Sequence, residues 1–126
     1  MQGLEQAARE YLNSNGFNCA YYATDPIQDG LVTVQETNRP GSSRFIGRTM
    51  LTFQAWASSR GKSEKLANDA LDAIVGRGAY ESAYGLAYSV PNIISCSPGN
   101  GPYRWDDPDV KELKRWQFTV EVDYNG

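Results

Sequence analysis

Residues 116–124 alternate apolar and polar side chains without interruption, reading Trp-Gln-Phe-Thr-Val-Glu-Val-Asp-Tyr. Because successive side chains of a strand point to opposite sides of a sheet, this run predicts a half-buried strand. One face carries Trp116, Phe118, Val120, Val122 and Tyr124, and the other carries Gln117, Thr119, Glu121 and Asp123. We expect the first face to lie in the core and the second to contact water or another chain.

The remaining elements follow from periodicity and turn residues. Helical spacing of apolar residues predicts helices over 4–12 and 63–74, with Gly16 after the first, Ser63 as the cap of the second, and Gly76 and Gly78 closing it. Strands are predicted over 17–23, 31–37, 48–58 and 90–96, and residues 77–89 are expected to be irregular with a short helical turn. This order predicts one α+β domain over residues 1–126, with an antiparallel or mixed sheet of about five strands and two main helices on one face.

The residue types needed for most enzyme mechanisms are scarce. The sequence contains no histidine, which removes the commonest general base and metal ligand and every Ser/His or Cys/His nucleophile pair. The acidic residues Asp106, Asp107, Asp109 and Glu112 lack the spacing of a calcium loop, and Gly61-Lys62-Ser63 lacks the upstream glycine of a phosphate-binding loop. We therefore expect a protein without catalytic residues, metal or cofactor.

Composition also narrows the environment and the partners. No apolar run approaches the roughly 20 residues that span a bilayer, so we expect a soluble protein kept inside a cell, without a membrane partner. Cys19 and Cys96 belong to no CxxC or Cys/His group, which favours two buried thiols over a disulfide. A net charge of -3 argues against the basic surface that binding to free DNA requires.

Charged and aromatic residues are unevenly distributed along the chain. Three arginines, Arg39, Arg44 and Arg48, share one stretch, whereas three aspartates crowd residues 106–109. These are either solvated loops or complementary patches, on one chain or between copies. Aromatic residues gather in the least regular part of the chain, at Tyr80, Tyr84, Tyr88, Tyr103 and Trp105, and favour a self-association or partner surface over a locally packed loop.

Three stretches resemble the tail terminator proteins of long-tailed bacteriophages. The first is Asn38-Arg39-Pro40 with Ser43-Arg44-Phe45-Ile46-Gly47-Arg48, the second is Phe53-Gln54-Ala55-Trp56-Ala57 followed by a Leu66-Ala67 helix, and the third is Tyr103-Arg104-Trp105-Asp106-Asp107-Pro108-Asp109 followed by Arg115-Trp116-Gln117-Phe118-Thr119-Val120. None of the three is a catalytic signature. The segment 77–89 matches no motif of the family.

The resemblance implies a structural protein of the virion that forms a homohexameric ring at the head-proximal end of the tail after assembly in the host cytoplasm. Such a ring caps the tail tube protein, ends its polymerisation, and joins the tail to the neck or head-completion protein, while DNA passes through without specific binding. Within this family the interface residues are expected to be Arg39, Arg44, Phe45 and Arg48 before one strand, and Tyr103, Trp105, Asp106 and Asp107 before the last. Alternatives are a head-closure or neck connector protein of the same virion, and a small-molecule-binding α+β domain with an apolar pocket.

Overall fold

The computed structural model describes residues 3–23, 27–38, 46–78, 85–90, 93–106, 108, 110 and 112–125. The helices are α1 (Leu4–Ser14), α2 (Arg60–Val75) and α3 (Leu86–Ser89), and the strands are β1 (Asn18–Ala20), β2 (Leu31–Asn38), β3 (Ile46–Ala57), β4 (Ile93–Pro98), β5 (Tyr103–Arg104) and β6 (Lys114–Asn125). In the part of the chain that the structure describes, no helix is both long and apolar enough to cross a membrane.

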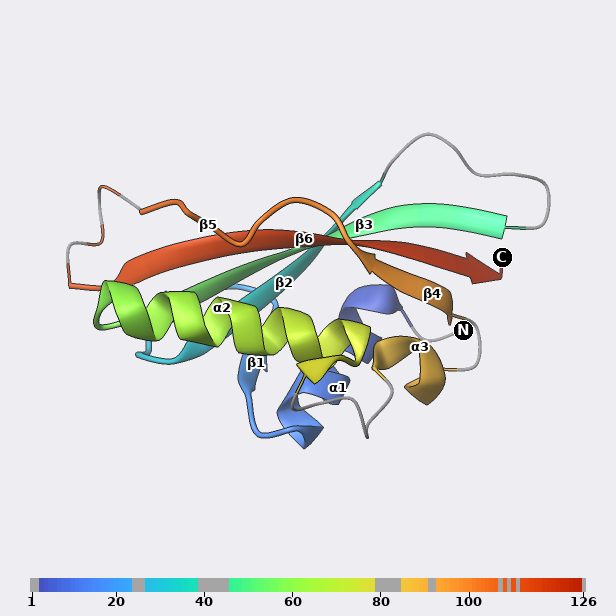
Figure 1. The fold of residues 1–126 in the computed structure, drawn as a ribbon, viewed down its shortest axis with the longest axis horizontal. Helices are drawn as coiled ribbons and strands as arrows, with labels where there is room; N and C mark the ends of the chain where they lie inside the picture. Colours follow the sequence, from blue (N-terminus) through green and yellow to red (C-terminus); the bar gives the residue numbers. More distant parts are fainter. Residues whose placement is uncertain are drawn as a thin grey trace.

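The strands form one six-stranded mixed sheet in the order β1, β2, β3, β6, β4, with β5 also paired to β6 (Figure 1). β3 and β6 pair antiparallel along their full length, from Ile46 opposite Asn125 to Ala57 opposite Lys114. β1 lies parallel to β2 at one edge, whereas β4 and β5 share the outer edge of β6. The predicted α+β fold with a mixed sheet is therefore confirmed, with one strand more than expected.

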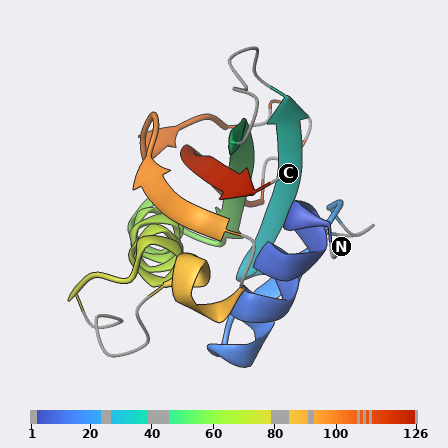
Figure 2. The ribbon, with the colours of Figure 1, turned by 90° about the vertical axis from the view of Figure 1, so that its right-hand side faces the viewer.

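The helices lie together on one side of the sheet, as the view along its length shows (Figure 2). α1 packs against β1 and β2, and α2 packs beneath β3 and β6. The core between these layers is apolar, and its central pair is Phe53 and Phe118, whose rings stack with centroids 4.8 Å apart and planes 9° apart. Phe118 belongs to the alternating run, and its neighbours Val120 and Val122 on the same face are also fully buried, as the pattern predicts.

The first helix forms as its apolar spacing predicts. Its inward face consists of Leu4, Ala7, Ala8, Tyr11 and Leu12, all buried. Asn15 follows as the C-cap, and Gly16 takes a positive φ of 91°, where a side chain would be strained. The helix runs two residues beyond the predicted 4–12, and the predicted glycine stop at Gly16 is confirmed.

The second helix begins earlier than expected, and the prediction that Ser63 caps it is wrong. The cap is Ser59, whose hydroxyl oxygen accepts a hydrogen bond from the Lys62 amide at 3.2 Å. Ser63 is instead buried within the helix, where its hydroxyl donates to the Arg60 carbonyl oxygen at 3.0 Å. At the other end Gly76 is left-handed, with φ 74°, as predicted.

Two predicted strands are shifted or shortened. The strand expected over 17–23 pairs with β2 only over Asn18–Ala20, and the strand expected over 90–96 runs over Ile93–Pro98. β5 was not predicted, since two residues carry no alternation. The expected short helical turn within 77–89 is α3, and residues 79–84 lie outside the described part. Both cysteines are free, as favoured, although Cys96 is only partly buried.

Candidate functional site

The face of the sheet that points away from the helices, here called the open face, carries most of the exposed polar side chains of β3 and β6. Register places on it the side chains that alternate with the core positions: Arg48, Met50, Thr52, Gln54 and Trp56 of β3, and Arg115, Gln117, Thr119, Glu121 and Asp123 of β6. The structure thus brings the polar half of the C-terminal run onto one continuous surface.

One end of the open face carries a second, smaller apolar cluster. Leu31, Trp56 and Leu113 are buried there, with 1%, 2% and 9% of their surface exposed. The Arg115 guanidinium lies over the Trp56 ring, 5.0 Å from its centroid. The sequence prediction missed this cluster because Leu113 reaches it from the segment before β6, and no periodic signal links that segment to β3.

Next to this cluster, a row of side-chain hydrogen bonds crosses three strands. The Gln54 amide donates to Gln117 at 3.0 Å, and the Gln117 amide donates to the Tyr103 hydroxyl oxygen at 2.8 Å. These three side chains are half-buried and opposite one another in the register. Because cross-strand partners fix one another's rotamers, this part of the open face is ordered and polar.

Thr119 differs from the other polar residues of the run because the chain itself covers it. Residues 99–102 pass over it: the Asn100 amide donates to the Thr119 hydroxyl at 2.7 Å, and the Thr119 amide donates to the Asn100 carbonyl at 2.8 Å. A Cβ at Gly99 would overlap the Thr119 hydroxyl, so only glycine permits this approach. Thr119 is 6% exposed, and it therefore contributes no accessible surface, unlike Glu121 and Asp123.

The other end of the open face is charged. The Arg48 guanidinium Nε donates to Asp123 at 2.8 Å, and the Ser95 hydroxyl is 3.4 Å from the second oxygen of the same carboxylate. The hydrogen bond from Arg48 lowers the pKa of Asp123 and, in return, raises the pKa of Arg48. Both side chains remain partly exposed, at 52% and 28%, so the pair is accessible to solvent and to partners.

At the end of the open face nearest the apolar cluster, an exposed aromatic residue directly follows β5 and lies among charged residues. Trp105 is 54% exposed, and its ring lies 5.8 Å from that of half-buried Tyr103. Trp105 is held by its backbone: its amide donates to the Arg115 carbonyl at 2.9 Å, and its carbonyl accepts from the Arg115 guanidinium at 2.5 Å. Asp106 beside it accepts from Arg104 at 3.4 Å. An exposed tryptophan on a fixed backbone is typical of an interface anchor.

The predicted interface residues divide into two groups in space. Arg48 lies at the Asp123 end of β3, whereas Tyr103, Trp105 and Asp106 lie beside the Gln117 and Arg115 end of β6. Arg48 and Trp56, the partner of Arg115, are eight positions apart along β3. At about 3.3 Å per residue, this distance is roughly 26 Å. Among the described residues, the structure therefore does not bring Arg48 together with Trp105 and Asp106 within one chain. Arg39, Arg44, Phe45 and Asp107 lie outside the described residues.

The chemistry available elsewhere in the described residues is limited. Burial raises the pKa of Cys19 and of Cys96 to about 12, so neither thiol is ready to act as a nucleophile at neutral pH. Among the described residues, no group of three or more Cys, Asp or Glu side chains could hold a metal ion. Of the surplus aromatic residues, Tyr80, Tyr84 and the Tyr88 side chain lie outside the described part.

Comparison with known proteins adds no family to this description: no protein-family model matches the sequence, and no curated protein matches it.

Proposed function

We propose that this protein is a phage tail terminator. It caps the tail tube as a homo-oligomeric, hexameric ring, ends polymerisation of the tube, and joins the tail to the neck. The proposal rests on the resemblance of three sequence stretches to that family. One structural observation supports self-assembly, which is the separation of the two candidate interface groups along β3 and β6.

This separation favours contacts between copies. A ring is built from heterologous contacts, in which each subunit offers two different and complementary surfaces. Arg48 carries a positive charge at one end of the open face, and Trp105 with Asp106 forms an aromatic and acidic surface about 26 Å away. An arginine side chain cannot span that distance, so complementary contact between the two groups requires a second copy.

The ion pairs within the chain do not prevent such a contact. Arg48 with Asp123 and Arg104 with Asp106 are solvent-exposed pairs, which contribute little to stability. They can exchange for pairs across an interface at little cost. Trp105, with its ring largely in water, supplies apolar area that assembly would bury.

The open face also suits a channel through which DNA slides. Its charged side chains from β3 and β6 are Arg48, Arg115, Glu121 and Asp123, which balance in formal charge, and the net charge of the chain is -3. A surface without an excess of cations does not retain a passing duplex, because affinity for DNA comes mainly from cations that contact phosphates. A ring whose lumen is strongly positive would contradict this part of the proposal.

The test is measurement of particle mass by native mass spectrometry, and of tube length by electron microscopy, with and without tail tube protein. We expect a closed ring, alone or on tube ends, and shorter, capped tubes. Arg48→Glu and Trp105→Ala should each weaken assembly or capping. A protein that stays monomeric and leaves tube length unchanged would overturn the proposal.

Matched controls are available for both variants. Arg77 forms an ion pair with Asp72 whose exposure, 53% for Arg77 and 31% for Asp72, is close to that of the Arg48 and Asp123 pair. Arg77 lies just after α2, away from the open face, so Arg77→Glu should assemble normally. Tyr22 is 74% exposed and lies beyond β1, so Tyr22→Ala controls for loss of an exposed aromatic residue. A ring that forms but never shortens tubes would favour the head-closure or neck connector alternative.

A further inference from the structure

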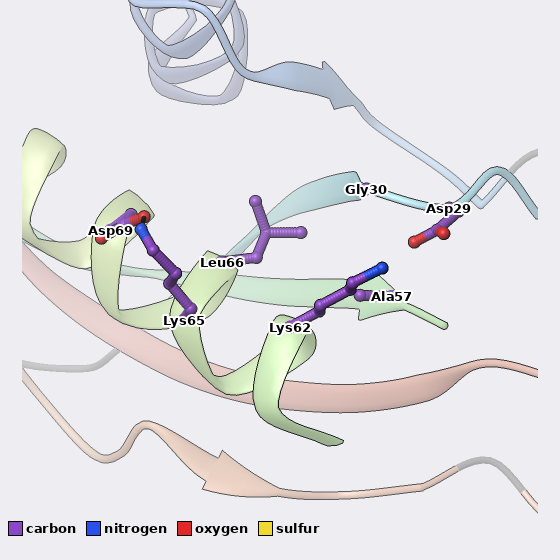
Figure 3. A pocket seen from close by; sticks show the side chains of 7 residues that line it. All are labelled: Asp29, Gly30, Ala57, Lys62, Lys65, Leu66 and Asp69. Carbon is purple, nitrogen blue, oxygen red and sulfur yellow. Dashed lines mark hydrogen bonds and ion pairs between the residues drawn. The ribbon is translucent and has the colours of Figure 1, made fainter. Parts of the chain in front are cut away.

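A cleft lies on the helix-covered side of the sheet, where β2 begins and β3 ends beside the first two turns of α2. Its volume is about 280 Å³, and Gly30, Ala57, Lys62 and Leu66 line it (Figure 3). It is on the opposite side of the sheet from the open face, so its occupation does not depend on the proposed ring.

The centre of the cleft is apolar. Ala57 is 3% exposed, and Leu66 is half-buried against the core. Nothing lies within 4 Å of the position that a Cβ of Gly30 would occupy, so this glycine leaves the space open. The volume equals about nine times the roughly 30 Å³ share of a water molecule in the liquid. A short aliphatic or aromatic molecule fits such a space.

The charged side chains around the cleft differ in how they are paired. The Lys65 ammonium lies 2.6 Å from Asp69, and Asp29 accepts a hydrogen bond from the Ser58 amide at 3.0 Å. Among the described residues, the Lys62 ammonium has neither a hydrogen bond nor an ion pair, and it extends toward the Asp29 end of the cleft (Figure 3). Lys62 is therefore the cation that a ligand can engage.

This combination selects the chemical class of the ligand. An ammonium that pairs with no described side chain, beside an apolar surface, suits a monoanion with an apolar tail. A phosphate dianion would need several donors, and Asp29 and Asp69 would repel its two charges more strongly than the single charge of a carboxylate. We propose that the cleft binds a small amphipathic carboxylate, with the carboxylate at Lys62 and the apolar tail against Leu66 and Ala57.

Hexanoate is the probe, and hexanamide is its neutral control. Ligand-observed NMR titration suits both a monomer and a ring. We expect hexanoate to bind with a dissociation constant on the order of 1–10 mM, as for other ligands of this size. Hexanamide should bind roughly two- to fivefold more weakly, since it lacks the charge. No binding of hexanoate up to roughly tenfold above that range, or equal binding of both molecules, would overturn the proposal.

Two single-charge substitutions locate the site. Lys62→Met should remove the preference for hexanoate over hexanamide while leaving the melting temperature nearly unchanged, since the side chain is exposed. Arg60→Met removes the same charge from the same turn of α2, but Arg60 does not line the cleft, so the preference should remain. A preference that survives Lys62→Met, or disappears equally in both variants, would place the binding elsewhere and reject this site.

Discussion

The two faces of the β3 and β6 pair are built from the same two strands but are covered differently. On the helix side, Phe53 and Phe118 stack in a core without exposed surface. On the open face, Gln54 and Gln117, each next in sequence to one of these phenylalanines, are joined by a hydrogen bond and remain partly exposed. The helix side thus stabilises mainly through burial, whereas the open face is held in order by polar contacts that leave it available to a partner.

The largest expected effect comes from the helix side. Phe53→Ala removes a ring that is fully buried and stacked, and should lower the free energy of unfolding by about 3–5 kcal/mol. The measurement is urea denaturation followed by circular dichroism. Thr52→Ala, one residue away on the open face, is the control and should change stability by less than about 1 kcal/mol. Equal effects of the two substitutions would break the distinction between the faces.

The alternating run explains why this distinction could be predicted. Period-two alternation fixes which side each residue faces, and it placed Phe118, Val120 and Val122 correctly in the core. It could not show that Thr119 is covered, because the covering residues 99–102 are held by backbone hydrogen bonds that no pattern encodes.

The start of α2 shows a second limit of sequence reasoning. Gly61-Lys62-Ser63 resembles a turn followed by a helix cap, which made Ser63 the apparent cap. A helix tolerates glycine more readily in its first turn, where the backbone amides lack intrahelical partners anyway, so Ser59 starts it four residues earlier. For the candidate interface, sequence only nominated residues, and the register shows that two of them, Arg48 and Trp105, are far apart.

A second prediction concerns the end of β3, where close packing depends on a missing side chain. A methyl group at Gly47 would overlap the ring of Tyr124, the residue opposite it on β6. Gly47→Ala should therefore lower the free energy of unfolding by about 1–3 kcal/mol. In the Tyr124→Ala background the same substitution should cost much less, since the ring is gone. Additive effects in this double-mutant cycle would show that the overlap is not the cause.

The polar row of the open face should contribute less. Gln117→Ala removes two side-chain hydrogen bonds, to Gln54 and Tyr103, and should cost about 0.5–1.5 kcal/mol because water can replace part of the loss. Chemical denaturation measures this value, and Tyr103→Phe should reproduce a part of it. A loss as large as that for Phe53→Ala would mean that the open face is a second core.

The smallest effect is expected at the charged end. Because Arg48 lowers the pKa of Asp123, the pair stabilises the fold above the ordinary carboxyl pKa, and this contribution declines as pH falls from about 4 through the lowered pKa. Asp123→Asn should be slightly less stable than the parent at pH 7, with the difference disappearing in acid and shrinking in high salt. Melting temperatures from pH 2 to 7 test this; a difference that grows in acid would contradict it.

The sheet order has a consequence for how the chain acquires its structure during synthesis. β6 lies between β3 and β4, and its register joins Ile46 to Asn125 across most of the sequence. Such long-range pairing is slow to form, because the chain loses the entropy of closing a long loop before the contacts across it can stabilise the structure. While the ribosome has yet to release β6, the nascent chain holds β2, β3 and both main helices with Phe53 lacking its partner. Any fragment ending before Lys114 should therefore remain a chaperone client rather than a folded domain.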